Sequence, residues 1–228
     1  MPQLVIFDCD GVLVDSEMIG CRTEATVFAA AGFHIDPDEI RRRFVGLSFK
    51  DQCAVLERER GWQLPPELLE RVRQTNAAAF ARELTAIAGI GPALDAIEGP
   101  VCVASSGLPE RIKYTLGLVG LIDRFWPHVF SSAMVARGKP APDLFLYAAE
   151  RMGMAASECT VIEDSVYGIE AALAAGMRAF GFAGGSHCDP AHGERLAAAG
   201  AHLVFGDMRR LPDILAGHDP VSGTDGAG

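Results

Sequence analysis

Short apolar runs alternate along this chain with stretches of helical periodicity. The runs are LVIFD at 4–8, VCVASS at 101–106, CTVIEDS at 159–165, RAFGFAGG at 178–185 and AHLVFGD at 201–207. Continuous apolar runs of this length are typical of parallel strands that are buried on both faces. Helices are predicted between them at 109–118, 142–152, 166–175, 191–199 and 208–215. The repeated order of strand and helix predicts an α/β fold with an open, Rossmann-like parallel sheet.

Residues 16 to 86 interrupt this rhythm because they contain no strand-like run. Helix-compatible stretches alternate there with the breaks AGFHIDPDE, VGLS and RGWQLPPE, which predicts an all-helical insertion of roughly four helices. We therefore expect a core domain formed by 1–14 and 89–216, with a helical cap domain at 15–88. The Gly- and Asp-rich end, 217–228, is predicted to be disordered.

Composition excludes some classes of partner. The chain has 228 residues, is 49% hydrophobic and carries a formal net charge of −10, so neither nucleic acid nor an anionic membrane surface is an expected partner. It contains no run of about 18 apolar residues, and no signal peptide is recognised. None of the six cysteines forms a C-x-x-C pair, which favours a reduced, cytoplasmic protein. A monomer is the expected state.

Candidate chemistry gathers where the predicted strands end. Ligands of open α/β sheets bind at the carboxyl ends of the strands. That rule brings together four short stretches: Asp8 and Asp10 after the first strand, Ser105 and Ser106 after VCVA, Glu163 and Asp164 after TVI, and Lys139 in the loop RGKPAPD. Clustered carboxylates without a thiol or an imidazole favour a hard, oxygen-seeking cation, above all Mg²⁺. The metal would supply the positive charge that this acidic edge lacks.

Each stretch also has a purely structural interpretation. A D-x-D after a strand is often a solvated turn, EDS suits the first turn of a helix, and SSG suits a turn or a cap. GKPAPD alone is typical of a loop and a helix start. The four together, in this order along the chain, are improbable without a shared function.

The set D-C-D-G-V-L-V-D-S-E, S-S-G, G-K-P-A-P-D and I-E-D-S resembles the four motifs of the haloacid dehalogenase-like (HAD) hydrolase superfamily. The resemblance covers residues 1 to about 215. Within the superfamily, the chain resembles the branch with a helical cap that includes β-phosphoglucomutases and sugar-phosphate phosphatases. DCDGVLVDSE and ELTAIAGIGPALDAI look most similar to the 6-phosphogluconate phosphatase group.

The resemblance implies a role for each acid at the sheet edge. Asp8 would be the nucleophile that forms an aspartyl-phosphate, and Asp10 would be the general acid and base. Asp8, the backbone carbonyl of Asp10, and Asp164 would hold Mg²⁺, with Glu163 in support. Lys139 would pair with both the phosphate and Asp8.

The same resemblance implies a phosphate-binding and substrate-binding set. Ser105 would bind the transferring phosphoryl group, with Ser106 and Gly107 beside it. The cap loop VGLSFK, 45–50, would face the site, and Lys50 would meet an anionic substrate. The implied activity is a Mg²⁺-dependent phosphatase acting on a small phosphorylated metabolite, a sugar phosphate or a sugar-acid phosphate such as 6-phosphogluconate.

Alternatives remain open at this point. A β-phosphoglucomutase would be expected to carry His at position 20 and Arg at position 49, where this chain has Gly20 and Phe49. A phosphonatase would need a Schiff-base lysine at position 49, one residue before Lys50. A binding protein that kept the fold without the chemistry would not be expected to retain all the motif acids and Lys139.

Overall fold

A six-stranded parallel sheet lies at the centre of the protein. The computed structural model describes residues 4–218. The strands are ordered β3-β2-β1-β4-β5-β6, and every adjacent pair is parallel. Their bounds are β1 Leu4–Phe7, β2 Val101–Ser105, β3 Val129–Ser131, β4 Cys159–Glu163, β5 Arg178–Phe182 and β6 Leu203–Phe205. The α/β fold predicted from the alternating runs is confirmed, with β1 paired on both sides, to β2 and β4.

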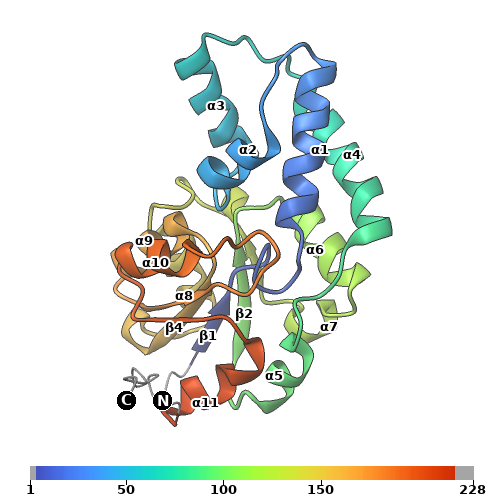
Figure 1. Ribbon diagram of the computed structural model, residues 1–228. Helices are drawn as coiled ribbons and strands as arrows, with labels where there is room; N and C mark the ends of the chain where they lie inside the picture. The colour runs from blue at the N-terminus through green and yellow to red at the C-terminus, as the bar shows by residue number, and fades with distance from the viewer. Residues whose placement is uncertain (1–3, 219–228) are drawn as a thin grey trace, which may run out of the picture.

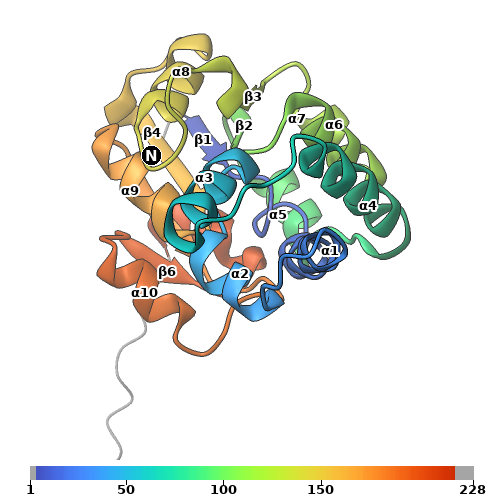
Figure 2. The same ribbon diagram turned by 90° about the horizontal axis from the view of Figure 1, so that it is seen from above.

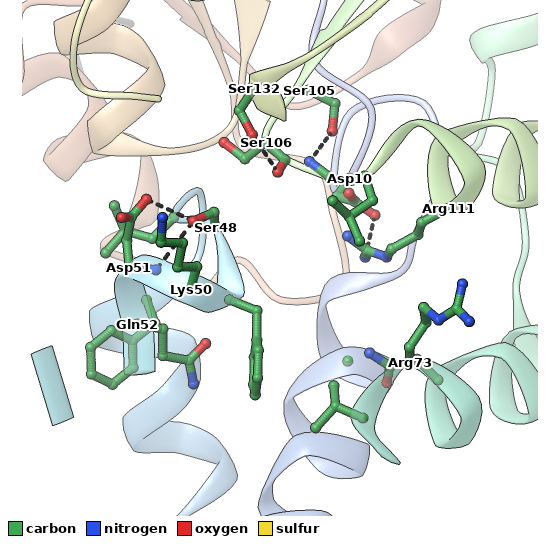
Figure 3. Close-up of a pocket in the computed structure, with 18 of the residues that line it drawn as sticks. Asp10, Ser48, Lys50, Asp51, Gln52, Arg73, Ser105, Ser106, Arg111 and Ser132 are labelled. Carbon is green, nitrogen blue, oxygen red and sulfur yellow. Dashed lines mark hydrogen bonds and ion pairs between the residues drawn. The ribbon is translucent and has the colours of Figure 1, made fainter. Parts of the chain in front are cut away.

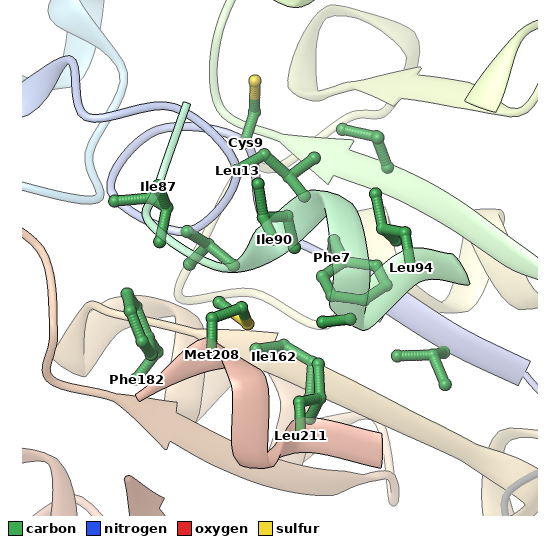
Figure 4. Packing of buried hydrophobic residues seen from close by; sticks show 14 of the residues in the cluster. Phe7, Cys9, Leu13, Ile87, Ile90, Leu94, Ile162, Phe182, Met208 and Leu211 are labelled. Carbon is green, nitrogen blue, oxygen red and sulfur yellow. The ribbon is translucent and has the colours of Figure 1, made fainter. Parts of the chain in front are cut away.

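The two faces of the sheet carry two hydrophobic clusters, because successive strand residues point to opposite faces. On one face, Phe7 and Ile162 pack with residues of α5 and α11 (Figure 4). On the other face, Leu4 and Ile6 pack with residues of α8, α9 and α10. The core helices are α5 Ile90–Ala96, α6 Pro109–Leu118, α7 Ile122–Phe125, α8 Asp143–Arg151, α9 Val166–Ala174, α10 His192–Ala198 and α11 Leu211–Ala216.

Four helices occupy the stretch between β1 and α5, as the sequence predicted. They are α1 Glu17–Ala30, α2 Pro37–Phe44, α3 Phe49–Arg60 and α4 Leu68–Glu83. A hydrophobic cluster of their own includes Phe28, Leu56 and Val72. These helices lie on the side of the sheet where the strands end, with α2 and α3 on one side and α1 and α4 on the other (Figures 1 and 2). We call α1–α4 the helical insertion.

The two connections to the helical insertion lie side by side. Val14 forms an antiparallel bridge with Ala86, and the Asp15 amide donates to the Thr85 carbonyl at 2.9 Å. The chain therefore enters and leaves the insertion at one place. The division into domains at 15–88 and 89–216 stays a prediction, although this pairing lies close to both proposed boundaries.

One strand and two α-helices of the core were not predicted. The short edge strand β3 and the helices α5 and α7 lie in stretches where no strand or helix was assigned. They have three, seven and four residues, too few to show a clear period of 2 or 3.6. The proposed disordered end, 217–228, lies almost entirely outside the described residues. Within 4–218 no helix is long and apolar enough to cross a membrane.

Candidate active site

Asp8 follows the buried strand β1 at the carboxyl edge of the sheet. The apolar residues of β1 are buried on both faces, and the ladder extends one residue further because the Asp8 amide donates to the Ile162 carbonyl at 3.0 Å. The chain then turns at Gly11, whose φ is +78°. A Cβ at Gly11 would lie 1.9 Å from Asp164 Oδ2, so glycine is required for the first loop to approach the β4 acids.

Lys139 is buried between two of the acids. Its ammonium Nζ lies 2.5 Å from Asp8 Oδ1 and 2.5 Å from Glu163 Oε1, and it donates to the Ala104 carbonyl at 3.1 Å. All three ammonium hydrogens therefore have an acceptor. Burial by itself lowers the pKa of Lys139, but Asp8 and Glu163 together raise it above the ordinary value. The lysine is a fixed positive charge beside Asp8 at every physiological pH.

Glu163 is held by the start of α9. Its Oε2 accepts from both the amide and the hydroxyl of Ser165 at 2.9 Å, and the Ser165 hydroxyl also caps the helix by accepting from the Gly168 amide. A Cβ at Gly168 would lie 1.9 Å from the Glu163 carboxylate. The sequence IEDSVYG therefore combines a helix cap, a glycine and a buried carboxylate in one turn.

The acids at this edge exceed the available cations. Among the described residues, the permanent cations in contact with Asp8, Asp10, Glu163 and Asp164 are Lys139 and Arg111, two positive charges against four carboxylates, and the titratable His187 lies against Asp164. Burial raises the pKa of Asp8 well above its usual range, Lys139 opposes the rise, and the neighbouring acids add to it. Burial likewise raises the pKa of Asp164, and Glu163 adds to that rise.

These acids fit a divalent cation. The buried oxygen Asp164 Oδ2 accepts no well-aligned hydrogen bond from the described residues. The donor set at Asp8, Asp10 and Asp164 consists of oxygen atoms, which Mg²⁺ prefers over softer ligands. A divalent cation would also balance the two surplus charges.

Asp10 is held by two residues that the sequence did not point to. Ser16 Oγ donates to Asp10 Oδ1 at 2.5 Å, and Arg111 Nη2 donates to the same oxygen at 2.8 Å. Ser16 occupies the N-cap position of α1 but makes no cap, because its hydroxyl is used by Asp10. Oδ2 takes no part in these contacts.

The position of Arg111 in the sequence could have identified it as a residue of the site. It lies in the first turn of α6, where the helix dipole disfavours a cation. A cation in that position suggests a compensating anion from elsewhere in the fold, which is here Asp10.

The predicted phosphate-binding residues surround the end of β2. Ser105 is buried, and its hydroxyl accepts from the Gly107 amide at 3.1 Å. The Ser106 hydroxyl donates to the Gly46 carbonyl at 3.0 Å, which connects the core to the helical insertion. The Gly107 carbonyl accepts from Ser131 Oγ at 2.6 Å. Ser105 and Gly107 line the same cavity as Asp8, whereas the Ser106 hydroxyl is used to hold the insertion.

Two histidines after β5 support Asp164. His187 Nε2 lies 2.9 Å from Asp164 Oδ2, and His192 Nε2 lies 2.6 Å from the Asp164 carbonyl. With Cys188 they place three possible metal-ligating atoms within 4.8 Å of one another. Both His192 nitrogens are already used, however, because Nδ1 lies 3.1 Å from Arg195 Nη2. The pair is better explained as a support that positions Asp164 than as a metal site.

A cavity of about 730 Å³ opens from these residues toward the helical insertion. Figure 3 shows Ser105, Ser106 and Asp10 along one edge of it, with Lys50 and Arg73 on the side of the insertion. Lys50 is exposed and lines the cavity from α3. Gly20 and Phe49 line the same cavity.

The fold and the site define a class: an α/β enzyme with a carboxylate centre at the carboxyl edge of a parallel sheet. The family profile of haloacid dehalogenase-like hydrolases matches residues 2–176. The chain is 35% identical over 213 residues to the 6-phosphogluconate phosphatase of Escherichia coli K12, covering 93% of this chain and 94% of that protein. The chain therefore belongs to the haloacid dehalogenase-like hydrolases, and it is a phosphoric monoester hydrolase.

Two solved structures agree with this assignment. A conserved haloacid dehalogenase-like protein from Agrobacterium tumefaciens is 39% identical, with a TM-score of 0.81 over 94% of this chain and 98% of that chain. A HAD family hydrolase from Deinococcus radiodurans, solved with phosphate and sodium bound, is 34% identical, with a TM-score of 0.74 over 95% and 96% of the two chains.

Proposed function

We propose that this protein is a Mg²⁺-dependent phosphatase that hydrolyses a small phosphorylated metabolite, a sugar phosphate or a sugar-acid phosphate, through an aspartyl-phosphate. The observation that carries this proposal is the contact of Lys139 Nζ with Asp8 and Glu163 at 2.5 Å each, inside a group of acids with two surplus negative charges. The similarity to a 6-phosphogluconate phosphatase supports the substrate class.

In the first step, an Asp8 oxygen attacks phosphorus, the new O–P bond forms, and the bond from phosphorus to the leaving oxygen breaks. Lys139 stabilises the phosphoryl charge and holds Asp8 in place. The Ser105 hydroxyl would donate a hydrogen bond to a phosphoryl oxygen. Asp10, oriented by Ser16 and Arg111 through Oδ1, gives a proton to the leaving oxygen.

In the second step, Asp10 accepts a proton from a water molecule, which attacks the phosphorus of the aspartyl-phosphate. The Asp8 carboxylate leaves, and inorganic phosphate is released. Asp8, Asp10 and Asp164, with Glu163 in support, are the residues that would hold Mg²⁺. When bound, the metal would offset the repulsion between the carboxylates and the phosphate.

The helical insertion is proposed to act as a cap over this site. It is held against the core by Ser106 on the Gly46 carbonyl, by the Tyr167 hydroxyl on the Arg43 carbonyl at 3.2 Å, and by an ion pair between Arg41 and Asp189 at 3.0 Å. A closed cap excludes water during the first step and selects the leaving group.

Removal of divalent metal should silence the enzyme. We expect no release of phosphate from p-nitrophenyl phosphate in excess EDTA, full recovery with Mg²⁺, and binding without good turnover with Ca²⁺, because Ca²⁺ accepts more ligands in a looser geometry. The measurement is a phosphate-release assay, with melting temperature recorded to follow metal binding separately. Full activity in excess EDTA would contradict the metal assignment.

Hydrolysis rather than isomerisation is the expected outcome with a sugar phosphate. A mutase must return the phosphoryl group to a reoriented sugar, which requires a cap that grips a second phosphate. Phe49 stands where the mutase pattern has an arginine, and its ring packs against Phe28 instead, with a centroid distance of 6.0 Å. An apolar ring cannot replace a bidentate guanidinium.

The test is incubation with Mg²⁺, β-glucose 1-phosphate and a trace of glucose 1,6-bisphosphate. Free phosphate should accumulate faster than glucose 6-phosphate. The opposite order would favour the phosphomutase alternative.

A further inference from the structure

The side of the cavity that the helical insertion forms has polar residues that no step of the proposed reaction uses. Glu24 lines it from α1, Gln52 from α3, and Arg73 and Asn76 from α4. Gly20 widens it, because a Cβ added there would meet no atom within 4 Å. This part of the cavity is where the leaving group of a substrate would lie once its phosphate reached Asp8.

Glu24 and Gln52 offer an acceptor and a donor at close range. The Gln52 side chain is buried, and its amide Nε2 has no hydrogen-bond partner among the described residues. It interacts with the Glu24 carboxylate, but not in the geometry of a well-aligned hydrogen bond. A buried donor without a partner is costly, so a bound group that accepts from Gln52 is favoured.

The cations that line the cavity are either paired with acids of the protein or exposed to solvent. Arg111 is paired with Asp10 at 2.8 Å, Arg73 is half exposed and paired with Glu70 at 2.9 Å, and Lys50 is exposed at the protein surface. Glu24 therefore faces the inner cavity as an acid without an ion-pair partner among the described residues. A carboxylate of the substrate placed there would meet a like charge, whereas a hydroxyl can donate to Glu24 and accept from Gln52.

We infer that the leaving group is an uncharged polyol or sugar whose hydroxyls bond to Glu24 and Gln52, and that Glu24 selects against a sugar acid. The inference rests on the proposed phosphatase function and narrows its substrate class. It also predicts that this chain prefers a substrate other than 6-phosphogluconate, which the name of its Escherichia coli relative would suggest.

The test compares two substrates with the same six-carbon chain, sorbitol 6-phosphate and 6-phosphogluconate, which differ only in a hydroxymethyl or a carboxylate group at the far end. In the unaltered protein at pH 8, kcat/KM is expected to be at least about tenfold higher for sorbitol 6-phosphate. Glu24→Gln should reduce this preference at least about fivefold, mainly through KM. Tenfold corresponds to about 1.4 kcal/mol.

Glu67→Gln is the matched control. Glu67 is an exposed acid at the start of α4 that does not line the cavity, so its removal changes the charge of the insertion without changing the preference. An equal loss of preference in both variants would overturn the role of Glu24, and so would a preference for 6-phosphogluconate in the unaltered protein.

The preference should also depend on pH. Burial raises the pKa of Glu24 to about 7, although the Gln52 amide and Arg111 oppose the rise. Below this pH Glu24 is protonated and no longer repels a carboxylate, so the preference for sorbitol 6-phosphate should fall from pH 8 to pH 6. The charged or titratable groups that interact with Glu24 are Cys21, Cys53, Arg111 and Asp10, and Glu17 lines the same cavity.

The Glu24→Gln variant distinguishes the titration of Glu24 from that of these neighbours, because its substrate preference should not change between pH 8 and pH 6. The ionisation of the phosphate itself cancels in the ratio of the two substrates. A slope that persists in Glu24→Gln would assign the effect to another group and overturn the role of Glu24.

p-Nitrophenyl phosphate distinguishes failure of the inference from failure of the proposed function. Its hydrolysis by the unaltered protein, with no turnover of sorbitol 6-phosphate, would leave a phosphatase and overturn the polyol assignment. Absence of hydrolysis for all three compounds would overturn the proposed function and the inference together.

Discussion

Asp8→Asn is expected to lower phosphate release by roughly 10⁴-fold or more, which is the scale of loss when a nucleophile is removed from a cooperating set. Asparagine keeps the shape of the side chain but has no charged oxygen to attack phosphorus. The measurement is kcat with p-nitrophenyl phosphate and saturating Mg²⁺. Asp123→Asn, which removes an exposed carboxylate from α7, is the control and should retain activity. Near-normal turnover by Asp8→Asn would remove Asp8 from the role of nucleophile.

The melting temperature of Asp8→Asn distinguishes a loss of activity from misfolding. The folded-state pKa of Asp8 lies above its ordinary value of 3.8, mainly through burial, so the folded protein binds this proton more tightly than the unfolded chain does. In EDTA, the Asp8 contribution to the free energy of unfolding therefore falls as pH rises from about 4 through the folded pKa. Asp8→Asn should have an equal or higher melting temperature in EDTA, with a weaker decline at rising pH. A lower melting temperature at every pH would indicate disruption of the fold instead.

Lys139→Met is expected to reduce both stability and activity. The substitution leaves Asp8 and Glu163 buried without the cation that contacts both, and breaking a buried pair in this way costs about 3–5 kcal/mol. For a chain of this size, that corresponds to a fall in melting temperature of roughly 6–20 °C. The loss of charge beside the phosphoryl group should lower kcat by about 10²–10³-fold. Thermal unfolding and phosphate release measure the two effects.

Two further variants make this prediction specific. Lys139→Met combined with Glu163→Gln should recover part of the melting temperature, because one uncompensated charge is removed, but none of the activity. Lys113→Met removes an exposed lysine over the Trp126 ring at 4.8 Å and should cost less than about 1 kcal/mol. If Lys139→Met unfolds no earlier than Lys113→Met, the buried ion pairs do not stabilise the protein as described.

Sequence patterns predicted the elements whose own residues carry a clear period or a motif. The apolar runs at 4–8 and 159–165 were predicted as strands, and they form β1 and β4 next to each other. The rule that ligands bind at the carboxyl ends of parallel strands was enough to bring Asp8 and Glu163 to one edge. The short elements β3, α5 and α7 were missed because so few residues cannot establish a period.

Contacts between distant segments were decided by tertiary packing. Asp8 and Lys139 are 131 positions apart, and Asp10 and Arg111 are 101 apart, so no local pattern records either pair. The motif acids were still recognisable in the sequence, because their order and spacing reflect the strand ends that they follow.

The sequence by itself determined the α/β class, the helical insertion and the acids at the sheet edge, because periodicity and strand-end motifs are local properties of the chain. Only the tertiary structure decided that Arg111 and Ser16 hold Asp10, that two histidines support Asp164, and that Glu24 faces Gln52 in the cavity. Most of these side chains come from helices and loops that lie apart in the sequence and are brought together by the packing of the folded protein. That packing is a property of the whole fold, and no single stretch specifies which partner each side chain meets.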